Sequence, residues 1–190
     1  WCDANPVARV EAPRVVEKPV PILTPQEIEQ ITTTAETYQG GSCAAAVGMM
    51  LYAGIRPHEV ARLTWAQVDL RERAIYILPQ HSKTGGARRV TIHKPLLRIL
   101  RSCKQADNEK ICPANWLHHW RELRRAAGWN SPARPWPQDA LRHTFASYHL
   151  SHFRSYAELQ VEIGHRDASL LRTRYVAQRP VVNAGAVWAA

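Results

Sequence analysis

The spacing of apolar and polar positions predicts helices in the first half of the chain. The stretch "TPQEIEQI" has the features of a helix start, with Thr24 as the N-cap, Pro25 in the first turn and Glu27 placed to complete a capping box. Gly40 and Gly41 are expected to end this helix. An almost wholly apolar stretch, "CAAAVGMMLYA", predicts a second, buried helix directly after them.

The periodicity then changes to that of strands. The stretch "VDLRERAIYIL" predicts two short strands around a charged turn, and "RRVTI" predicts a third, after the glycine-containing connection "HSKTGGA". Helical spacing returns later, over residues 94–104, 113–128, 139–151, 155–163 and 169–176, and the last ten residues contain a short apolar segment. The pattern therefore predicts a mainly α fold with a small antiparallel β-sheet, in the α+β class.

The composition adds a preference for a polyanionic partner. The chain has 190 residues, enough for one domain with its own core, and a formal net charge of +9. Arginine suits bidentate contacts to phosphate, so nucleic acid is the first expected partner, and a basic protein without such a partner is the alternative. Residues 1–23 are rich in proline, have no helical period and predict an extended linker.

Other classes of function lose support. No apolar run approaches the roughly 20 residues needed to cross a bilayer, so no membrane association is expected. The four cysteines have no zinc-ligand spacing and are expected to be free thiols in a reducing cytoplasm. Neither glycine-rich phosphate-binding motif occurs, so we expect no nucleotide cofactor. No carboxylate or thiolate completes a ligand set near the histidines, so we expect no metal. The start of the chain does not resemble a signal peptide. It begins with Trp1 and lacks an initiator methionine, which suggests a fragment of a longer protein.

Polar residues at the ends of the predicted elements are candidates for chemistry. Each has an ordinary structural explanation when taken singly: a surface ion pair, a solvated hairpin lysine, a buried tyrosine or a hydrogen-bonded histidine. The stretch "DALRHTFASYHL" poses the question most directly, because an arginine and a histidine lie side by side in the first turn of an apolar helix. The candidates are Arg56 with Glu59 beside it, Lys83, Arg142, His165 and Tyr175.

Their order along the chain resembles the catalytic domain of the tyrosine recombinases, the phage-integrase family. The resemblance covers roughly residues 22 to 180 and is carried by "GIRPHEVARLTW", by a lysine in a β-hairpin, by "LRHTFAS" and by "GH…RY". It implies that residues 1–22 are a linker from a missing N-terminal core-binding domain, that residues 23–180 form the catalytic domain, and that residues 181–190 are a C-terminal tail. The implied fold is that of the DNA breaking-rejoining enzymes.

The resemblance also implies a mechanism and a partner. Tyr175 would attack a phosphodiester of double-stranded DNA and form a 3′-phosphotyrosyl intermediate, without ATP, metal or other cofactor. Arg56 and Arg142 would clamp the phosphate, and Lys83 would protonate the leaving 5′-oxygen. His165 would hydrogen-bond a phosphate oxygen. The family assembles as a tetramer on DNA, and we expect a monomer off DNA.

One residue departs from the family pattern. The position three residues before the second arginine, usually His and sometimes Lys, is Asp139 here. A carboxylate beside a scissile phosphate would repel the charge that the arginines attract. Three explanations remain: Gln138 supplies a neutral donor, Asp139 turns away and caps the helix, or the enzyme is slow or inactive. The capping explanation is preferred, with Gln138 as a partial substitute.

Four functions are compatible with the sequence. The first is a DNA recombinase that integrates or excises a mobile element. The others are a type IB topoisomerase, a catalytically impaired DNA-binding relative and a helical interaction domain without DNA. The tail raises a separate alternative: Val187 and Trp188 either pack on a neighbouring protomer on DNA or fold back on their own domain.

Overall fold

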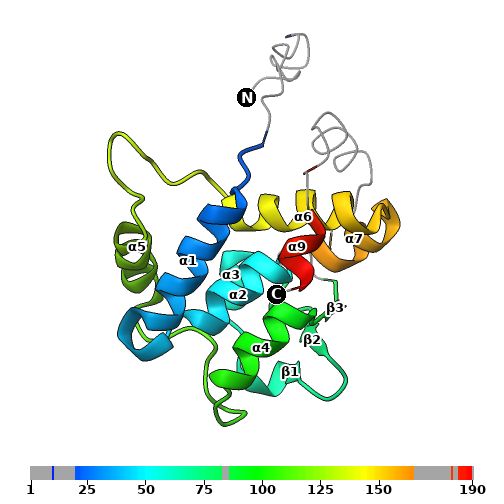
Figure 1. Cartoon of the computed structure of the whole chain (residues 1–190). Helices are drawn as coiled ribbons and strands as arrows, with labels where there is room; N and C mark the ends of the chain where they lie inside the picture. Colours follow the sequence, from blue (N-terminus) through cyan, green and yellow to red (C-terminus); the bar gives the residue numbers. More distant parts are fainter. Residues whose placement is uncertain (1–9, 11–19, 83–85, 165–180, 182–183, 190) are drawn as a thin grey trace, which may run out of the picture.

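The computed structural model describes residues 10, 20–82, 86–164, 181 and 184–189. Within them, helices surround the apolar helix α2, and a small sheet lies at one side (Figure 1). The helices are α1 (Pro25–Thr37), α2 (Ala44–Tyr52), α3 (Pro57–Val60), α4 (Lys94–Ser102), α5 (Trp116–Ala126), α6 (Ala140–Phe153), α7 (Tyr156–Ile163) and α9 (Ala184–Ala189), with 3-10 turns at Tyr38–Gly41 and Trp65–Gln67. The predicted fold class is confirmed.

Helix α1 begins as the sequence predicts. The backbone N–H of Glu27 donates to the Thr24 hydroxyl at 3.3 Å, and the Thr24 N–H donates to the Glu27 carboxylate at 2.9 Å. The same carboxylate accepts a hydrogen bond from Arg134 at 2.7 Å, which fastens the proline-rich loop of residues 131–137 to α1. Helix α1 ends at Thr37, and the glycine pair belongs to the 3-10 turn that follows it.

Helix α2 is the centre of the core. All nine of its residues are buried, and it packs against α1, α4 and α6. No side chain caps its start, so packing rather than local sequence holds it in place. The start of the described chain is fixed to α6, because the N–H of Leu23 donates to the Thr144 hydroxyl at 2.8 Å and the Tyr148 hydroxyl donates to the Leu23 carbonyl at 3.1 Å.

The sheet has three antiparallel strands in the order β1-β2-β3. They are β1 (Val68–Asp69), β2 (Ala74–Ile77) and β3 (Arg88–Thr91). In the β2–β3 register, Ile75 pairs with Val90 and Ile77 pairs with Arg88. The three predicted strands are therefore present. Strand β3 also contacts α7, because both the N–H and the hydroxyl of Thr91 donate to the Glu162 carboxylate, at 2.9 and 2.6 Å.

The described residues cover only part of what was predicted for the C-terminal part of the chain. The predicted helix at residues 169–176 lies outside the described residues. The apolar segment near the end forms α9, which packs against α6 and α4 of its own domain, with Trp188 only 8% exposed (Figure 1). None of the helices in the described ranges combines the length and the apolar character that a membrane span requires.

Candidate active site

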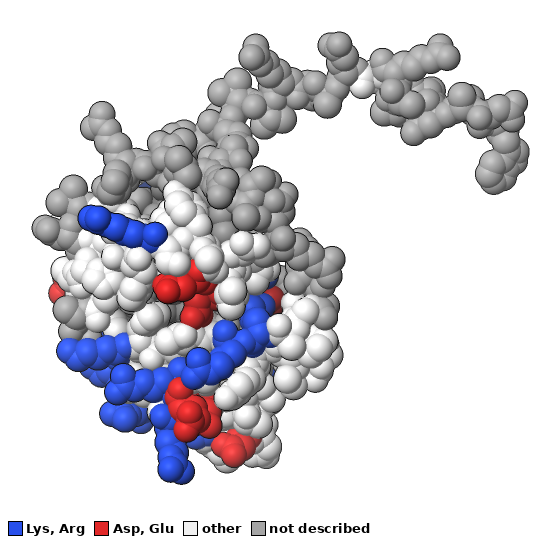
Figure 2. All heavy atoms as spheres, turned by 90° about the vertical axis from the view of Figure 1, so that its right-hand side faces the viewer, with Lys and Arg blue, Asp and Glu red and all other residues white. Residues whose placement is uncertain are grey.

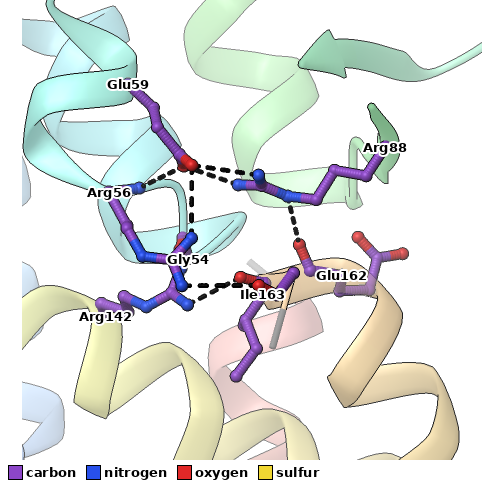
Figure 3. Close-up of polar contacts among 8 residues, drawn as sticks. Gly54, Arg56, Glu59, Arg88, Arg142, Glu162 and Ile163 are labelled. Carbon is purple, nitrogen blue, oxygen red and sulfur yellow. Dashed lines mark hydrogen bonds and ion pairs between the residues drawn. The ribbon is translucent and has the colours of Figure 1, made fainter. Parts of the chain in front are cut away.

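Glu59 is the centre of a buried polar cluster (Figure 3). Pro57 begins the short helix α3, and Glu59 two residues later reaches back to accept the N–H of Arg56 at 3.1 Å. The guanidinium of Arg56 also donates to this carboxylate, at 3.2 Å. Glu59 is completely buried, and the Arg56 side chain is 16% exposed. The predicted Arg–Glu pair is therefore present, but it lies in the interior rather than on the surface.

Arg88 is a second cation on Glu59 that the sequence analysis missed. Its guanidinium donates to both carboxylate oxygens, at 3.1 and 2.6 Å, and its Nε donates to the Glu162 carbonyl at 3.2 Å. The sequence contained a signal: Arg88 lies two residues before the apolar Val90 in β3, so both side chains point to the same face of the sheet. A charge on the inward face needs a buried partner, and Glu59 supplies it.

The two arginines keep Glu59 ionised. Burial alone would raise the pKa of its carboxyl group, but the hydrogen bonds and charge of Arg88, together with those of Arg56, lower the pKa to about 2. The carboxylate holds Arg56 and Arg88 in fixed positions as a result. Its bidentate contact with Arg88 uses the planar geometry that guanidinium groups offer.

Arg142 answers the question raised by "RH" at the start of α6. Its side chain is buried, with 7% exposure, and it does not lie on the solvated side of the helix. One guanidinium nitrogen donates to the carbonyl of Gly54, and another donates to the carbonyl of Ile163 at 2.7 Å. Arg56 donates to the next carbonyl, that of Gly164, at 3.4 Å. The two predicted arginines, far apart in sequence, are thus brought to the same turn at the end of α7.

Gly54 is required at the position that receives Arg142. Its φ is +60°, in the left-handed region that favours glycine, and a Cβ here would overlap the ring of Phe145. The backbone can therefore pass close to α6 and present its carbonyl to Arg142 only without a side chain.

Three predicted catalytic residues, Lys83, His165 and Tyr175, lie outside the described residues. Their roles remain predictions. His165 follows Gly164 directly in the sequence, and the carbonyl of Gly164 accepts a hydrogen bond from Arg56. Lys83 belongs to the connection between β2 and β3.

The preferred explanation for Asp139 is wrong in its detail. Asp139 does stand at the N-cap position of α6, but its side chain makes no capping hydrogen bond. The reason is its backbone, which is left-handed at φ 51° and ψ 23°, whereas a capping side chain needs an extended backbone to reach the first turn. Asp139 and Gln138 are both exposed, and both line a cavity of about 280 Å³ that Arg142 also lines.

The charge on the surface is consistent with an anionic partner. Figure 2 shows Lys and Arg side chains in a band across one face of the molecule, with acidic residues beside it. Among the described residues, no group of three or more His, Cys, Asp and Glu side chains is arranged to hold a metal ion.

The comparisons with known proteins agree with this architecture. The crystal structure of XerA recombinase is similar with a TM-score of 0.68 and 21% identity, over 86% of this chain and 62% of that one. The catalytic domain of bacteriophage HP1 integrase gives 0.66 and 20%, over 88% and 94% of the two chains. A lambda integrase (75–356) dimer bound to a COC′ core site gives 0.66 and 20%, over 95% and 69%.

These likenesses show the fold, and this chain spans only 62% of the XerA chain. No curated protein matches it. A family model provides the assignment, because it matches residues 21–180, which is most of the chain and includes Arg56 and Arg142. The chain belongs to the phage integrase family.

Proposed function

We propose that this chain is the catalytic domain of a site-specific DNA recombinase that cleaves and rejoins DNA strands through a phosphotyrosine intermediate. The single observation that carries the proposal is the meeting of Arg56 and Arg142 at the turn formed by Ile163 and Gly164. Arg142 is buried, Arg56 is only 16% exposed, and paired guanidinium groups are suited to a phosphate in its transition state.

The remaining roles follow from the residue types. The Tyr175 hydroxyl loses its proton to water as its oxygen attacks the phosphorus atom, the bond to the 5′-oxygen breaks, and Lys83 gives that oxygen a proton. Attack by a 5′-hydroxyl of another strand reverses the step, so the energy of the phosphodiester bond is conserved in the tyrosyl ester. His165 donates a hydrogen bond to a nonbridging oxygen. Glu59 does not touch the substrate in this scheme but positions Arg56.

Arg56 is suited to a phosphate contact. Among the described residues its guanidinium donates to Glu59 and Gly164, which leaves part of its five-donor capacity for an anion, and its side chain is partly exposed. Solved structures of this fold have been determined with DNA, among them the lambda integrase dimer on its core site. We propose the same partner, double-stranded DNA, for this chain, and integration or excision of a mobile element as the task.

The covalent intermediate can be tested directly. The chain and its Tyr175→Phe variant are incubated with a pool of random duplexes that carry a bridging 5′-phosphorothiolate, whose thiol leaves without a general acid and re-attacks poorly. Denaturing gels should show a protein–DNA adduct with the chain and none with the variant. Sequencing the trapped DNA would then identify the cleavage site.

The same assay separates the alternatives. Absence of an adduct, together with DNA binding that weakens steeply as salt rises, would favour a catalytically impaired DNA-binding relative, which the carboxylate of Asp139 makes a specific candidate. Relaxation of supercoiled plasmid without strand exchange between duplexes would instead favour a topoisomerase. Absence of both adduct and salt-dependent DNA binding would contradict the proposal and leave an interaction domain.

Assembly forms a second part of the proposal. We expect a monomer off DNA and a tetramer on DNA, in which the tail of residues 181–190 moves from its own domain to a neighbouring protomer. Helix α9 contains the residues to be exchanged, and off DNA Trp188 is packed against α6 and α4 of the same chain. Deletion of residues 181–190 should weaken assembly on DNA without changing monomer binding, and unchanged assembly would refute this part.

A further inference from the structure

A cavity with aromatic walls lies beside Arg142, and the proposed mechanism does not use it. Its volume is about 280 Å³, and it lies between α3, α5 and the start of α6. Trp120 comes from α5, and Trp136 comes from the proline-rich loop before α6. This volume is near the lower limit for small-ligand pockets, so the cavity is suited to one small planar group rather than to a chain segment.

The two indoles form a rigid corner. Trp120 and Trp136 meet at a centroid distance of 5.3 Å and an interplanar angle of 83°. Each ring is supported from a second side, Trp120 by Trp116, stacked at 5.7 Å, and Trp136 by Trp129, edge to face at 5.2 Å. A flat ligand that enters such a corner stacks on one ring while its rim meets the other.

Polar groups of both signs also line the cavity. The guanidinium of Arg124 lies 5.0 Å from the Trp120 ring centroid and 5.7 Å from that of Trp136. Its Nε donates to the Trp120 carbonyl at 3.2 Å, and its terminal nitrogens have no hydrogen-bond acceptor among the described residues. The exposed Asp139 supplies a carboxylate whose side chain does not cap α6.

We propose that this cavity binds one unpaired nucleobase of the DNA substrate, with a preference for guanine, next to the phosphate held by Arg142. Guanine offers the acceptors O6 and N7, which suit Arg124, and the adjacent donors N1–H and N2–H, which suit the two oxygens of Asp139. Stacking on aromatic rings is the usual way to hold an extruded base. A bare phosphate fits less well, because Asp139 would repel it.

This inference rests on the proposed function, since it assigns a feature of the DNA substrate to that activity. It also gives Asp139 a task other than phosphate binding. The carboxylate that departs from the family pattern would read a base edge rather than act on the scissile phosphate.

The test uses the whole chain labelled with 5-fluorotryptophan and fluorine NMR. Trp120→Phe and Trp136→Phe each remove one signal and so assign the two wall residues. Deoxyguanosine 5′-monophosphate is titrated to millimolar concentration, alongside thymidine 5′-monophosphate, deoxyribose 5-phosphate and inorganic phosphate. We expect saturable shifts of both wall signals with the guanine nucleotide, weaker binding of the thymine nucleotide, and no shift of these signals with the two compounds that lack a base.

Two variants and a matched control complete the design. Asp139→Ala should weaken binding of the guanine nucleotide about tenfold, as expected for loss of a charge-assisted contact. Trp136→Ala should also weaken it about tenfold, through loss of stacking. Leu117→Ala is the control, because Leu117 is 80% exposed on the same helix but lines a different groove, and it should leave the affinity unchanged.

Several outcomes would overturn the inference. Equal shifts with inorganic phosphate would make the cavity a phosphate site, and an absence of shifts at the two wall signals would remove the site altogether. Equal affinities for the guanine and thymine nucleotides, or an unchanged affinity in Asp139→Ala, would overturn the guanine preference. The titration does not depend on Tyr175. An adduct without nucleotide binding would therefore contradict only this inference, and nucleotide binding without an adduct would contradict only the proposed cleavage.

Discussion

Replacing Glu59 by glutamine tests whether the buried cluster holds the site together. The substitution keeps the shape of the side chain but leaves Arg56 and Arg88 without a counter-charge in the interior. The pKa of Glu59 is about 2, against an ordinary value of 4.5, and this difference corresponds to about 3 kcal/mol of stability at neutral pH. Removal of one partner from a buried ion pair costs a similar amount, about 3–5 kcal/mol.

Urea unfolding at pH 7 measures this loss. With a slope of about 2 kcal/mol per molar urea, the Glu59→Gln variant should unfold at a midpoint lowered by about 1.5 M. The matched control is Glu122→Gln, which removes a surface pair with the 62% exposed Arg125 and should change stability by less than about 1 kcal/mol. A loss below about 1 kcal/mol in Glu59→Gln would refute the assignment of Glu59 as the anchor of the cluster.

The pH dependence gives a second, independent measure. Because the folded-state pKa of Glu59 is lowered, its contribution is complete above pH 4.5 and is lost as the pH falls from about 4.5 to about 2. Glu59→Gln should lack this part of the pH profile. In the double variant Glu59→Gln with Arg88→Met, the total loss of unfolding free energy should be smaller than the sum of the two single losses, because the second substitution removes a cation that the first leaves unpaired. Additive losses would contradict a direct interaction.

Three further predictions concern other parts of the fold. Gly54→Ala should destabilise the domain by about 1–3 kcal/mol in thermal or urea unfolding, because its Cβ would overlap Phe145. Thr24→Ala should cost about 1 kcal/mol through loss of the α1 cap, and Thr24→Ser should restore it. Burial, with help from His93 and His152, lowers the pKa of His149 to about 4, so stability should fall as the pH drops from about 6.5 to about 4. Hydrogen exchange of residues 184–189, which pack on this cluster through Trp188, should speed up over that range, and unchanged exchange would contradict the prediction.

Local signals explain what the sequence predicted well. The capping box at Thr24 and the change of period at the strands are properties of short stretches, and the structure contains both. The resemblance implied that Arg142 faces a phosphate; the structure shows that its side chain is buried, and the phosphate contact stays a prediction. Such features depend on neighbours within a few residues, where spacing along the chain is informative.

Features made by distant segments were beyond the same reasoning. Arg88 becomes part of the cluster only because β3 and α3 meet at Glu59. The sequence indicates only that Arg88 shares a face of the strand with Val90, two residues later. The residue type of Asp139 predicted a side-chain cap, but its left-handed backbone prevents that hydrogen bond, and a backbone conformation cannot be inferred from residue type. The corner of Trp120 and Trp136 joins a helix to a loop, so no helical or strand period connects the two rings.

Glu162, near the end of α7, joins that helix to strand β3. Its carboxylate holds the N–H and the hydroxyl of Thr91, while its carbonyl accepts the Nε of Arg88, so β3 and the end of α7 are fastened at both ends of the strand. In the sequence, Lys83 shortly precedes β3 and His165 shortly follows α7. Because Glu162 joins β3 to the end of α7, a displacement of one of these two elements is expected to displace the other. If Lys83 and His165 have the roles proposed above, Glu162 therefore links the element that follows the proton donor with the element that precedes the phosphate ligand.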